Sequence, residues 1–126
     1  MKVVFDTSVL VDCLRNLRNA VEAVNLVAKE EIDGFISVIT EAELYAGKDC
    51  RVSSGAAAVA GLISLFTKIT LDNDIAQKAA EFRRNFNVEI PDAIIAATAF
   101  LQDAKVWTKN YEDFRPVKEI AVEEPY

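Results

Sequence analysis

The chain of 126 residues is long enough to bury one hydrophobic core and too short for two ordinary domains. Its hydrophobic content of 52% excludes intrinsic disorder, and its net charge of −6 argues against general counterion-driven binding to nucleic acid. No apolar run reaches the roughly 20 residues of a membrane-spanning helix, and the first residues read as a strand rather than an export signal. We therefore expect a cytoplasmic protein with a single domain over residues 1–126.

Strand-like and helix-like segments alternate along the whole chain. In chain order, the sequence predicts strand 3–5, helix 9–17, helix 19–31, strand 35–39, helix 40–46, helix 56–66, strand 67–71, helix 75–86, helix 93–101, strand 105–108 and strand 117–122. This alternation is typical of an α/β fold. We expect a three-layer sandwich with a mostly parallel central sheet.

Three local patterns refine these elements. Thr40 and Glu43 match a capping box, in which each residue caps the other at the start of a helix. Asp72 precedes the helix 75–86 as a capping residue. The segment 56–66 is apolar nearly all round, so it is expected to be either deeply buried or part of an interface with a partner.

Acidic residues recur where strand-like segments give way to helices: Asp6, Glu43, Asp92 and Asp113. In a parallel sheet the carboxyl ends of the strands face one crevice, so these side chains can converge. Converging carboxylates repel one another unless a cation lies between them. The chain has no histidine, and oxygen ligands suit Mg²⁺ or Mn²⁺ better than Zn²⁺. The pattern predicts metal-dependent chemistry on a phosphate.

Each acid also has a purely structural explanation. Asp6 lies where a helix-capping residue would lie, although the hydroxyls that follow it can cap as well. Glu43 cannot reach a metal if it bends back to complete its capping box. Asp92 is stabilised by the dipole of the helix that it opens. Asp113 lies in a turn, where acids are usually solvated.

Four segments, Asp6–Asp12, Ser37–Gly47, Ile90–Ala99 and Thr108–Phe114, resemble in order the four motifs of PIN-domain nucleases. The resemblance is greatest to the VapC toxins of toxin–antitoxin pairs, and it spans most of the chain. One position departs from the motifs, because many members of the family have an aspartate where this chain has Asn110.

The resemblance implies a metal-dependent endoribonuclease that cleaves single-stranded RNA. It places Mg²⁺ or Mn²⁺ on Asp6 and Asp92, with Glu43 positioning or deprotonating the attacking water. The other catalytic candidates that it implies are Asp113, which could replace the missing acid, Ser8, which could orient a carboxylate, and Asn110, which could bind a water. The candidates for contacts with the RNA backbone are Lys48, Arg51 and Lys109.

The family also implies two protein partners, an antitoxin that binds near the acidic crevice and a second copy of the chain. The alternative function is a catalytically weak PIN-like module that binds protein. Two other enzyme classes fit poorly. A haloacid-dehalogenase-type phosphatase needs a second aspartate where Ser8 stands, and a response-regulator receiver needs an acid where Phe5 stands.

Overall fold

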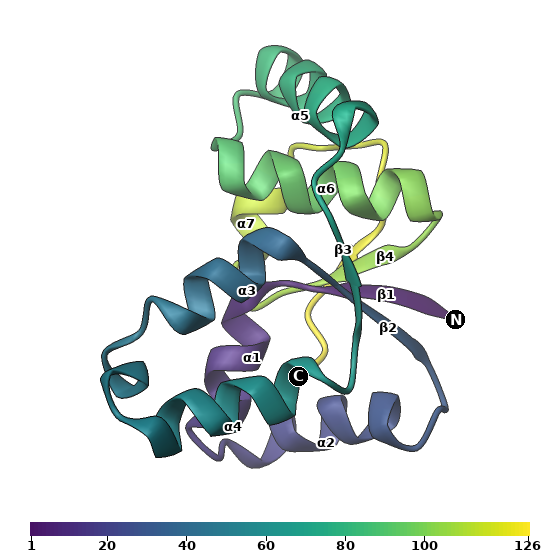
Figure 1. The fold of residues 1–126 in the computed structure, drawn as a ribbon. Coiled ribbons are helices and arrows are strands. Elements are labelled where there is room, and N and C mark those ends of the chain that lie inside the picture. Colours follow the sequence, from purple (N-terminus) through teal and green to yellow (C-terminus); the bar gives the residue numbers. More distant parts are fainter.

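Five parallel strands form the central sheet of the computed structural model, which describes all residues from Met1 to Tyr126. Their order across the sheet is β3-β2-β1-β4-β5 (Figure 1). The strands are β1 (Lys2–Phe5), β2 (Asp33–Ser37), β3 (Thr67–Ile69), β4 (Lys105–Trp107) and β5 (Val122–Glu123). Strands β2 and β3 follow on one side of β1, and strands β4 and β5 follow on its other side. The direction in which successive strands are added therefore reverses between β1 and β4. In open α/β sheets, ligands bind at such a switch point.

Seven α-helices and one 3₁₀ helix surround the sheet. They are α1 (Thr7–Leu14), α2 (Arg18–Ala28), α3 (Val38–Tyr45), η1 (Lys48–Arg51), α4 (Ser53–Ile63), α5 (Asn73–Phe86), α6 (Ile90–Gln102) and α7 (Tyr111–Phe114). None of the helices is long and apolar enough to cross a membrane. The predicted alternation of strands and helices and the three-layer α/β fold are confirmed.

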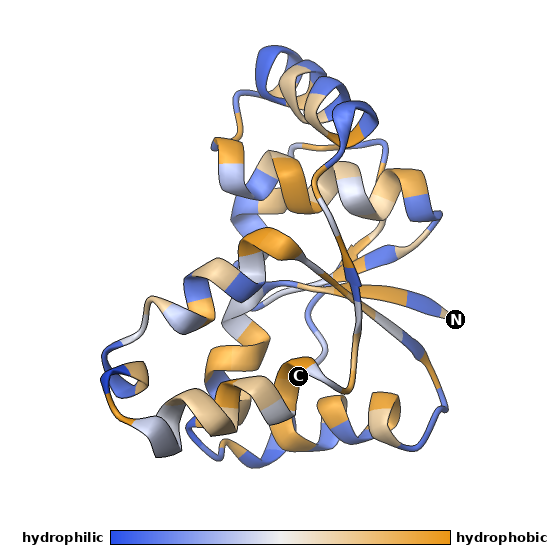
Figure 2. Cartoon of the chain, viewed as in Figure 1, coloured by the Kyte–Doolittle hydropathy of each residue, from blue (hydrophilic) through white to orange (hydrophobic).

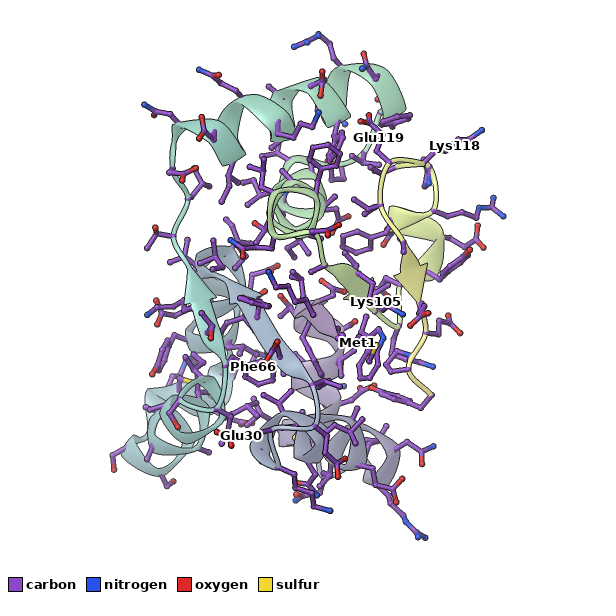
Figure 3. The ribbon with its side chains drawn as sticks, turned by 90° about the vertical axis from the view of Figure 1, so that its right-hand side faces the viewer. Met1, Glu30, Phe66, Lys105, Lys118 and Glu119 are labelled. Atoms are coloured by element: carbon purple, nitrogen blue, oxygen red, sulfur yellow. The ribbon has the colours of Figure 1, made fainter.

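The central strand β1 contributes to two hydrophobic cores, because successive side chains in a strand point to opposite faces. Val3 and Phe5 pack with residues of α1, α2, α3 and α4, whereas Val4 packs with residues of α5 and α6. Figure 3 shows side chains filling both spaces between the layers. All three residues are fully buried, so β1 is covered on both faces from Val3 to Phe5.

Helix α6 lies between the sheet and α5 (Figure 1). Seven of its residues are buried, and the Phe100 ring packs edge-on against Phe82 of α5 with the centroids 5.9 Å apart. Hydrophilic residues follow the outer side of α5, whereas α6 is mostly hydrophobic (Figure 2). The amino end of α6, which carries Asp92, is therefore fixed against the sheet.

The predicted start of α3 at Thr40 is wrong. The helix begins at Val38, because the Ser37 side chain accepts a hydrogen bond from the Ile39 amide at 3.1 Å and caps it. Strand β2 therefore ends at Ser37 instead of residue 39. The predicted cap at Asp72 is confirmed, since its carboxylate accepts from the Ile75 amide at 2.9 Å.

Two further expectations need correction. The predicted strand 117–122 contributes only Val122 to β5, because Val117 turns inward after α7 and is buried in the core under α6. The helix expected over 56–66 forms as α4, three residues earlier than predicted; of the two alternatives for it, deep burial is wrong and an interface with a partner stays a prediction. Only Val59 and Leu62 of α4 are buried, which leaves an exposed apolar face.

Replacement of Gly34 by alanine should destabilise the protein. A Cβ at this position in β2 would lie 2.6 and 2.8 Å from the two methyl carbons of Val27, whose β-branched side chain has little rotamer freedom. We expect Gly34→Ala to lower the free energy of unfolding by about 1–3 kcal/mol, measured by urea denaturation.

Gly61→Ala is the matched control. A Cβ at Gly61 meets nothing within 4 Å, and the residue lies inside α4. Alanine should therefore raise the free energy of unfolding by about 0.5–1 kcal/mol. Equal stability of the two variants would contradict the close packing of α2 on β2.

Candidate active site

Asp6 is the most deeply buried acid of the chain, with 5% of its surface exposed. It directly follows β1, and its main-chain amide donates to the Trp107 oxygen of β4 at 2.9 Å. Its carboxylate Oδ2 accepts from Ser8 Oγ and from Thr108 Oγ1, both at 2.8 Å. The carboxylate makes no capping hydrogen bond to α1, so the capping explanation for this residue is wrong. Oδ1 has no hydrogen-bond partner in the chain and is free to bind a ligand.

The two hydroxyl donors are themselves held by the loop that follows β4. Ser8 Oγ accepts from the Lys109 amide at 3.0 Å, and Thr108 Oγ1 accepts from the Asn110 amide at 2.8 Å. Each hydroxyl therefore donates a hydrogen bond to Asp6 and accepts one from a main-chain amide. This arrangement orients the Asp6 carboxylate at the switch point between β1 and β4.

Glu43 is an exposed residue of α3 that contacts α1. Its Oε1 accepts from Thr7 Oγ1 at 2.8 Å, and Thr7 Oγ1 also lies 3.0 Å from Thr40 Oγ1. The predicted capping box is wrong, because Ser37 caps α3 and Glu43 reaches across to α1 instead. Glu43 is therefore free of the competing role that its sequence pattern indicated.

Asp92 lies in the first turn of α6, next to these groups. Partial burial raises the pKa of its carboxyl group from the ordinary 3.8 to about 6. The negative charges that raise this pKa further are those of Asp6, Asp113, Glu43 and Glu89. Burial and repulsion thus outweigh the stabilisation that a helix amino terminus gives to a carboxylate.

Three of the predicted acids line one open pocket of about 420 Å³, which we call the acidic pocket. Its lining residues are Asp6, Thr7, Ser8, Val11, Asp12, Arg15, Glu43, Asp92, Lys109 and Asn110. Arg15 and Lys109 are its cations, and Arg15 makes no ion pair within the chain. Lys48 and Arg51 do not line it.

The donor set of the acidic pocket fits a hard divalent cation. All its charged ligand candidates are carboxylates, and the chain contains no histidine. The side chains are not drawn together as closely as in a loaded site, since no group of three or more acids or cysteines is near enough to hold a metal ion. Burial, and after it repulsion from the neighbouring acids, raises the pKa of Asp92 in this arrangement.

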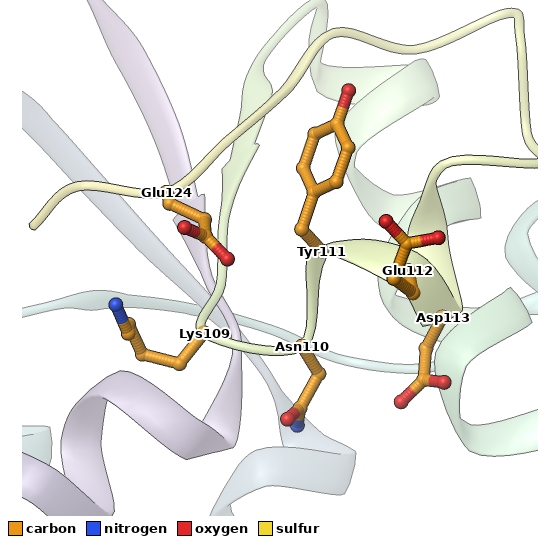
Figure 4. Close-up of a pocket in the computed structure, with 6 residues that line it drawn as sticks. All are labelled: Lys109, Asn110, Tyr111, Glu112, Asp113 and Glu124. Carbon is orange, nitrogen blue, oxygen red and sulfur yellow. The ribbon is translucent and has the colours of Figure 1, made fainter.

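Asp113 lies outside the acidic pocket, in a neighbouring pocket of about 700 Å³ that we call the side pocket (Figure 4). Its lining residues are Lys109, Asn110, Tyr111, Glu112, Asp113 and Glu124. Asn110 lines both pockets, and its side chain makes no capping hydrogen bond to α7. The structure therefore brings Asn110 to Asp6, Glu43 and Asp92, while Asp113 acts on Asp92 only through its charge.

Tyr126 is a residue of this region that the sequence did not reveal. Its hydroxyl donates to Asp12 Oδ2 at 2.7 Å, and its main-chain oxygen accepts from Lys109 Nζ. The same ammonium group lies 4.6 Å from the centre of the Tyr126 ring, within the range of a cation–π contact. Burial, and then the hydrogen bond to Asp12, raise the pKa of the tyrosine hydroxyl. Tyr126 therefore fixes the direction of the Lys109 side chain.

Residues 3–120 match the family model of the PIN domain. The chain belongs to the PIN-domain family. The resemblance to PIN-domain nucleases that the four motifs indicated is thus confirmed, and it covers most of the chain.

Solved structures similar to this PIN domain include several toxin–antitoxin complexes. A toxin–antitoxin complex from Klebsiella pneumoniae contains a chain that is 30% identical, with 98% of each chain covered and a TM-score of 0.82. DNA-bound VapBC from Salmonella typhimurium is 24% identical, with 100% of this chain and 99% of the other covered and a TM-score of 0.85. VapBC2 from Rickettsia felis, bound to a promoter DNA fragment, is 20% identical, with 98% of each chain covered and a TM-score of 0.84. No curated protein matches the sequence.

Replacement of Asp92 by asparagine should stabilise the metal-free PIN domain at neutral pH. Because folding raises the pKa of Asp92 from 3.8 to about 6, the unfolded state loses this proton first as the pH rises. As the pH rises from 3.8 to about 6, the ionisation of Asp92 therefore lowers the free energy of unfolding more and more. Above pH 6 the whole of this destabilisation is present.

We expect Asp92→Asn to raise the free energy of unfolding at pH 8 by about 1–2 kcal/mol after allowance for solvent screening. The gain should vanish near pH 3. Urea denaturation at pH 8 and pH 3, with EDTA present, measures this gain in the free energy of unfolding. An equal gain at the two pH values would contradict the destabilising charge of Asp92. Asp103→Asn, an exposed acid at the opposite end of α6, is the control.

Proposed function

We propose that this PIN domain is a metal-dependent endoribonuclease that cleaves single-stranded RNA and acts as the toxin of a toxin–antitoxin pair. One observation carries the proposal. Asp6, oriented by two hydroxyls, faces Glu43 and Asp92 in one pocket at the switch point of the sheet. An all-oxygen acidic pocket of this kind suits chemistry on a phosphodiester.

In this proposal Asp6 and Asp92 hold Mg²⁺ or Mn²⁺. A divalent cation bound there supplies a Lewis acid that polarises the scissile phosphate. Ser8 is a positioning residue, because its hydroxyl fixes one oxygen of Asp6 and leaves the other free. Thr108 is a second positioning residue, because its hydroxyl donates to the same oxygen of Asp6.

Glu43 is the proposed acceptor of the proton from the attacking water. Thr7 fixes one of its oxygens, which leaves the second oxygen available in the acidic pocket. Asn110 takes the place of an acid found in many relatives, and its amide can hydrogen-bond a water at the rim of the pocket. Asp113 adds negative charge near Asp92, which favours cation binding.

The RNA backbone would be held by the cations of the acidic pocket. Arg15 is exposed and unpaired, and Lys109 is held at the rim by Tyr126. Two local cations next to the acids reconcile RNA binding with the net charge of −6, because phosphate contacts depend on local charge.

Cleavage of single-stranded RNA with Mg²⁺ tests the enzyme. We expect the wild-type protein to cleave and Asp6→Asn to lose activity by at least about 100-fold, since even groups that only orient metal ligands contribute 10- to 100-fold. Thr108→Val should lose about 10- to 100-fold, because it removes one donor to Asp6. Glu31→Gln, an exposed acid in the loop before β2, should keep full activity.

Cation binding has a readout that does not depend on cleavage. Mg²⁺ should raise the melting temperature of the wild-type protein and not that of Asp6→Asn, because a ligand that binds only the folded state stabilises it. A metal response without cleavage of any RNA would favour the alternative, a catalytically weak module that binds protein. Absence of both responses would refute the metal site.

The proposed partners are a cognate antitoxin and a second copy of the chain. The antitoxin is suggested by the toxin–antitoxin complex of Klebsiella pneumoniae, to which this chain is 30% identical. A homodimer is suggested by the exposed apolar face of α4, on which Ala57, Ala58 and Ala60 are exposed. Small side chains of this kind let two helices approach closely.

Light scattering tests the homodimer. We expect a dimer at micromolar concentration, and Ala58→Glu should shift it to a monomer because it buries a charge in the interface. Ala80→Glu, an exposed alanine on α5, should leave the dimer intact. A monomeric wild-type protein would contradict the dimer. For the antitoxin, the test is growth arrest on induction that a protein encoded next to this one relieves.

A further inference from the structure

The side pocket adjoins the acidic pocket and shares two lining residues with it, Lys109 and Asn110. An RNA strand whose scissile phosphate lies in the acidic pocket can therefore place a neighbouring nucleotide at the side pocket. A volume of about 700 Å³ is ample for one nucleotide. The chemistry of its walls decides which base fits.

Tyr111 supplies an aromatic wall. It is the one hydrophobic residue among the six that line the side pocket, and its hydroxyl makes no hydrogen bond within the chain. In the view of Figure 4, Glu124 and Glu112 lie on either side of Tyr111, and its ring extends beyond both carboxylates. Aromatic rings in such positions stack on unpaired RNA bases.

Glu124 supplies free acceptors. Its carboxylate makes no hydrogen bond or ion pair within the chain, whereas Glu112 is paired with Arg115 at 3.1 Å. An ionised carboxylate has two acceptor oxygens side by side and no donor. It therefore matches an edge that presents two adjacent donors.

Guanine is the RNA base whose Watson–Crick edge has that pattern, with N1–H next to the N2 amino group. The corresponding edges of adenine, cytosine and uracil place an acceptor next to each donor, and that acceptor would face a carboxylate oxygen. A nucleobase is neutral, so it can enter beside acids that would repel a phosphate. The phosphate of the same nucleotide would remain at Lys109, on the boundary between the two pockets.

We propose that the side pocket binds a guanine base next to the cleaved phosphodiester, stacked on Tyr111 and paired with Glu124. This inference rests on the proposed ribonuclease function. A basic side chain of a protein partner is the competing occupant. Arg115 already pairs with Glu112, one of the three acids, and Lys109 adds a positive charge to the lining, which favours a neutral ligand with paired donors.

Cleavage of matched RNAs tests the proposal in the intact protein. The RNAs differ only in the nucleotides that flank the cleaved bond. Guanine at one of these positions should raise kcat/KM by at least about 10-fold over the other three bases, the usual discrimination of a bidentate contact. Glu124→Gln should abolish most of this ratio, because its amide offers one donor in place of an acceptor.

Two variants of Tyr111 distinguish the loss of base stacking from a general disturbance of the structure. Tyr111→Phe keeps the ring and should keep the guanine ratio, whereas Tyr111→Ala should raise KM for every RNA. Glu31→Gln should leave the ratio as in the wild-type protein. Equal cleavage of the four RNAs, or a guanine ratio unchanged in Glu124→Gln, would overturn the proposal.

Nucleotide binding tests the side pocket even if no RNA is cleaved. In NMR titrations, GMP should shift the amide signals of Tyr111 and Glu124 at lower concentration than AMP, CMP or UMP. GMP selectivity without cleavage would refute the ribonuclease and support the guanine site. If the four nucleotides bind alike and argininamide binds through Glu124 instead, the pocket takes a basic side chain and the proposal is wrong.

Discussion

Repulsion between carboxylates that a parallel sheet gathers at one edge is the constraint on which this structure depends. The two central acids, Asp6 and Asp92, have different surroundings. Asp6 receives two hydroxyl donors, which offset the cost of its burial. Asp92 accepts no hydrogen bond within the chain, and burial together with the neighbouring charges raises its pKa. Asp6 is thus oriented by the fold, whereas no group of the chain donates a hydrogen bond to Asp92.

Strand β1 links this constraint to the stability of the whole molecule. Its three buried side chains join the two hydrophobic cores, and the residue that follows them is Asp6. A change that loosens either core therefore also moves the acidic pocket. Helix α6 has a similar double role, because the most buried helix of the fold carries Asp92 in its first turn. The acids are placed by packing, so their mutual repulsion cannot relax without disturbing a core.

Much of the fold and of the acidic pocket could be predicted from the sequence, because hydrophobic periodicity and helix capping are local patterns. The alternation of elements, the parallel sheet and the acids at the strand ends all follow from such patterns. The orientation of Glu43 did not follow from the sequence, because Ser37 and Thr40 could each cap α3. Ser37 caps the helix, and Glu43 instead accepts a hydrogen bond from Thr7 of α1. The side chains of Tyr126 and Asp12 are joined across 114 positions, a distance at which no local pattern exists.

The hydrogen bond between Thr108 and Asp6 joins residues that are 102 positions apart. Strand β4, which brings Thr108 to the centre of the sheet, leaves the ribosome long after β1. Domains fold as units, and sheets that pair distant strands form late. A growing chain without β4 has Asp6 but neither the second hydroxyl nor the loop that holds Ser8. The hydrogen bonds around Asp6 therefore cannot all form until the residues of β4 and of the loop after it have been synthesised.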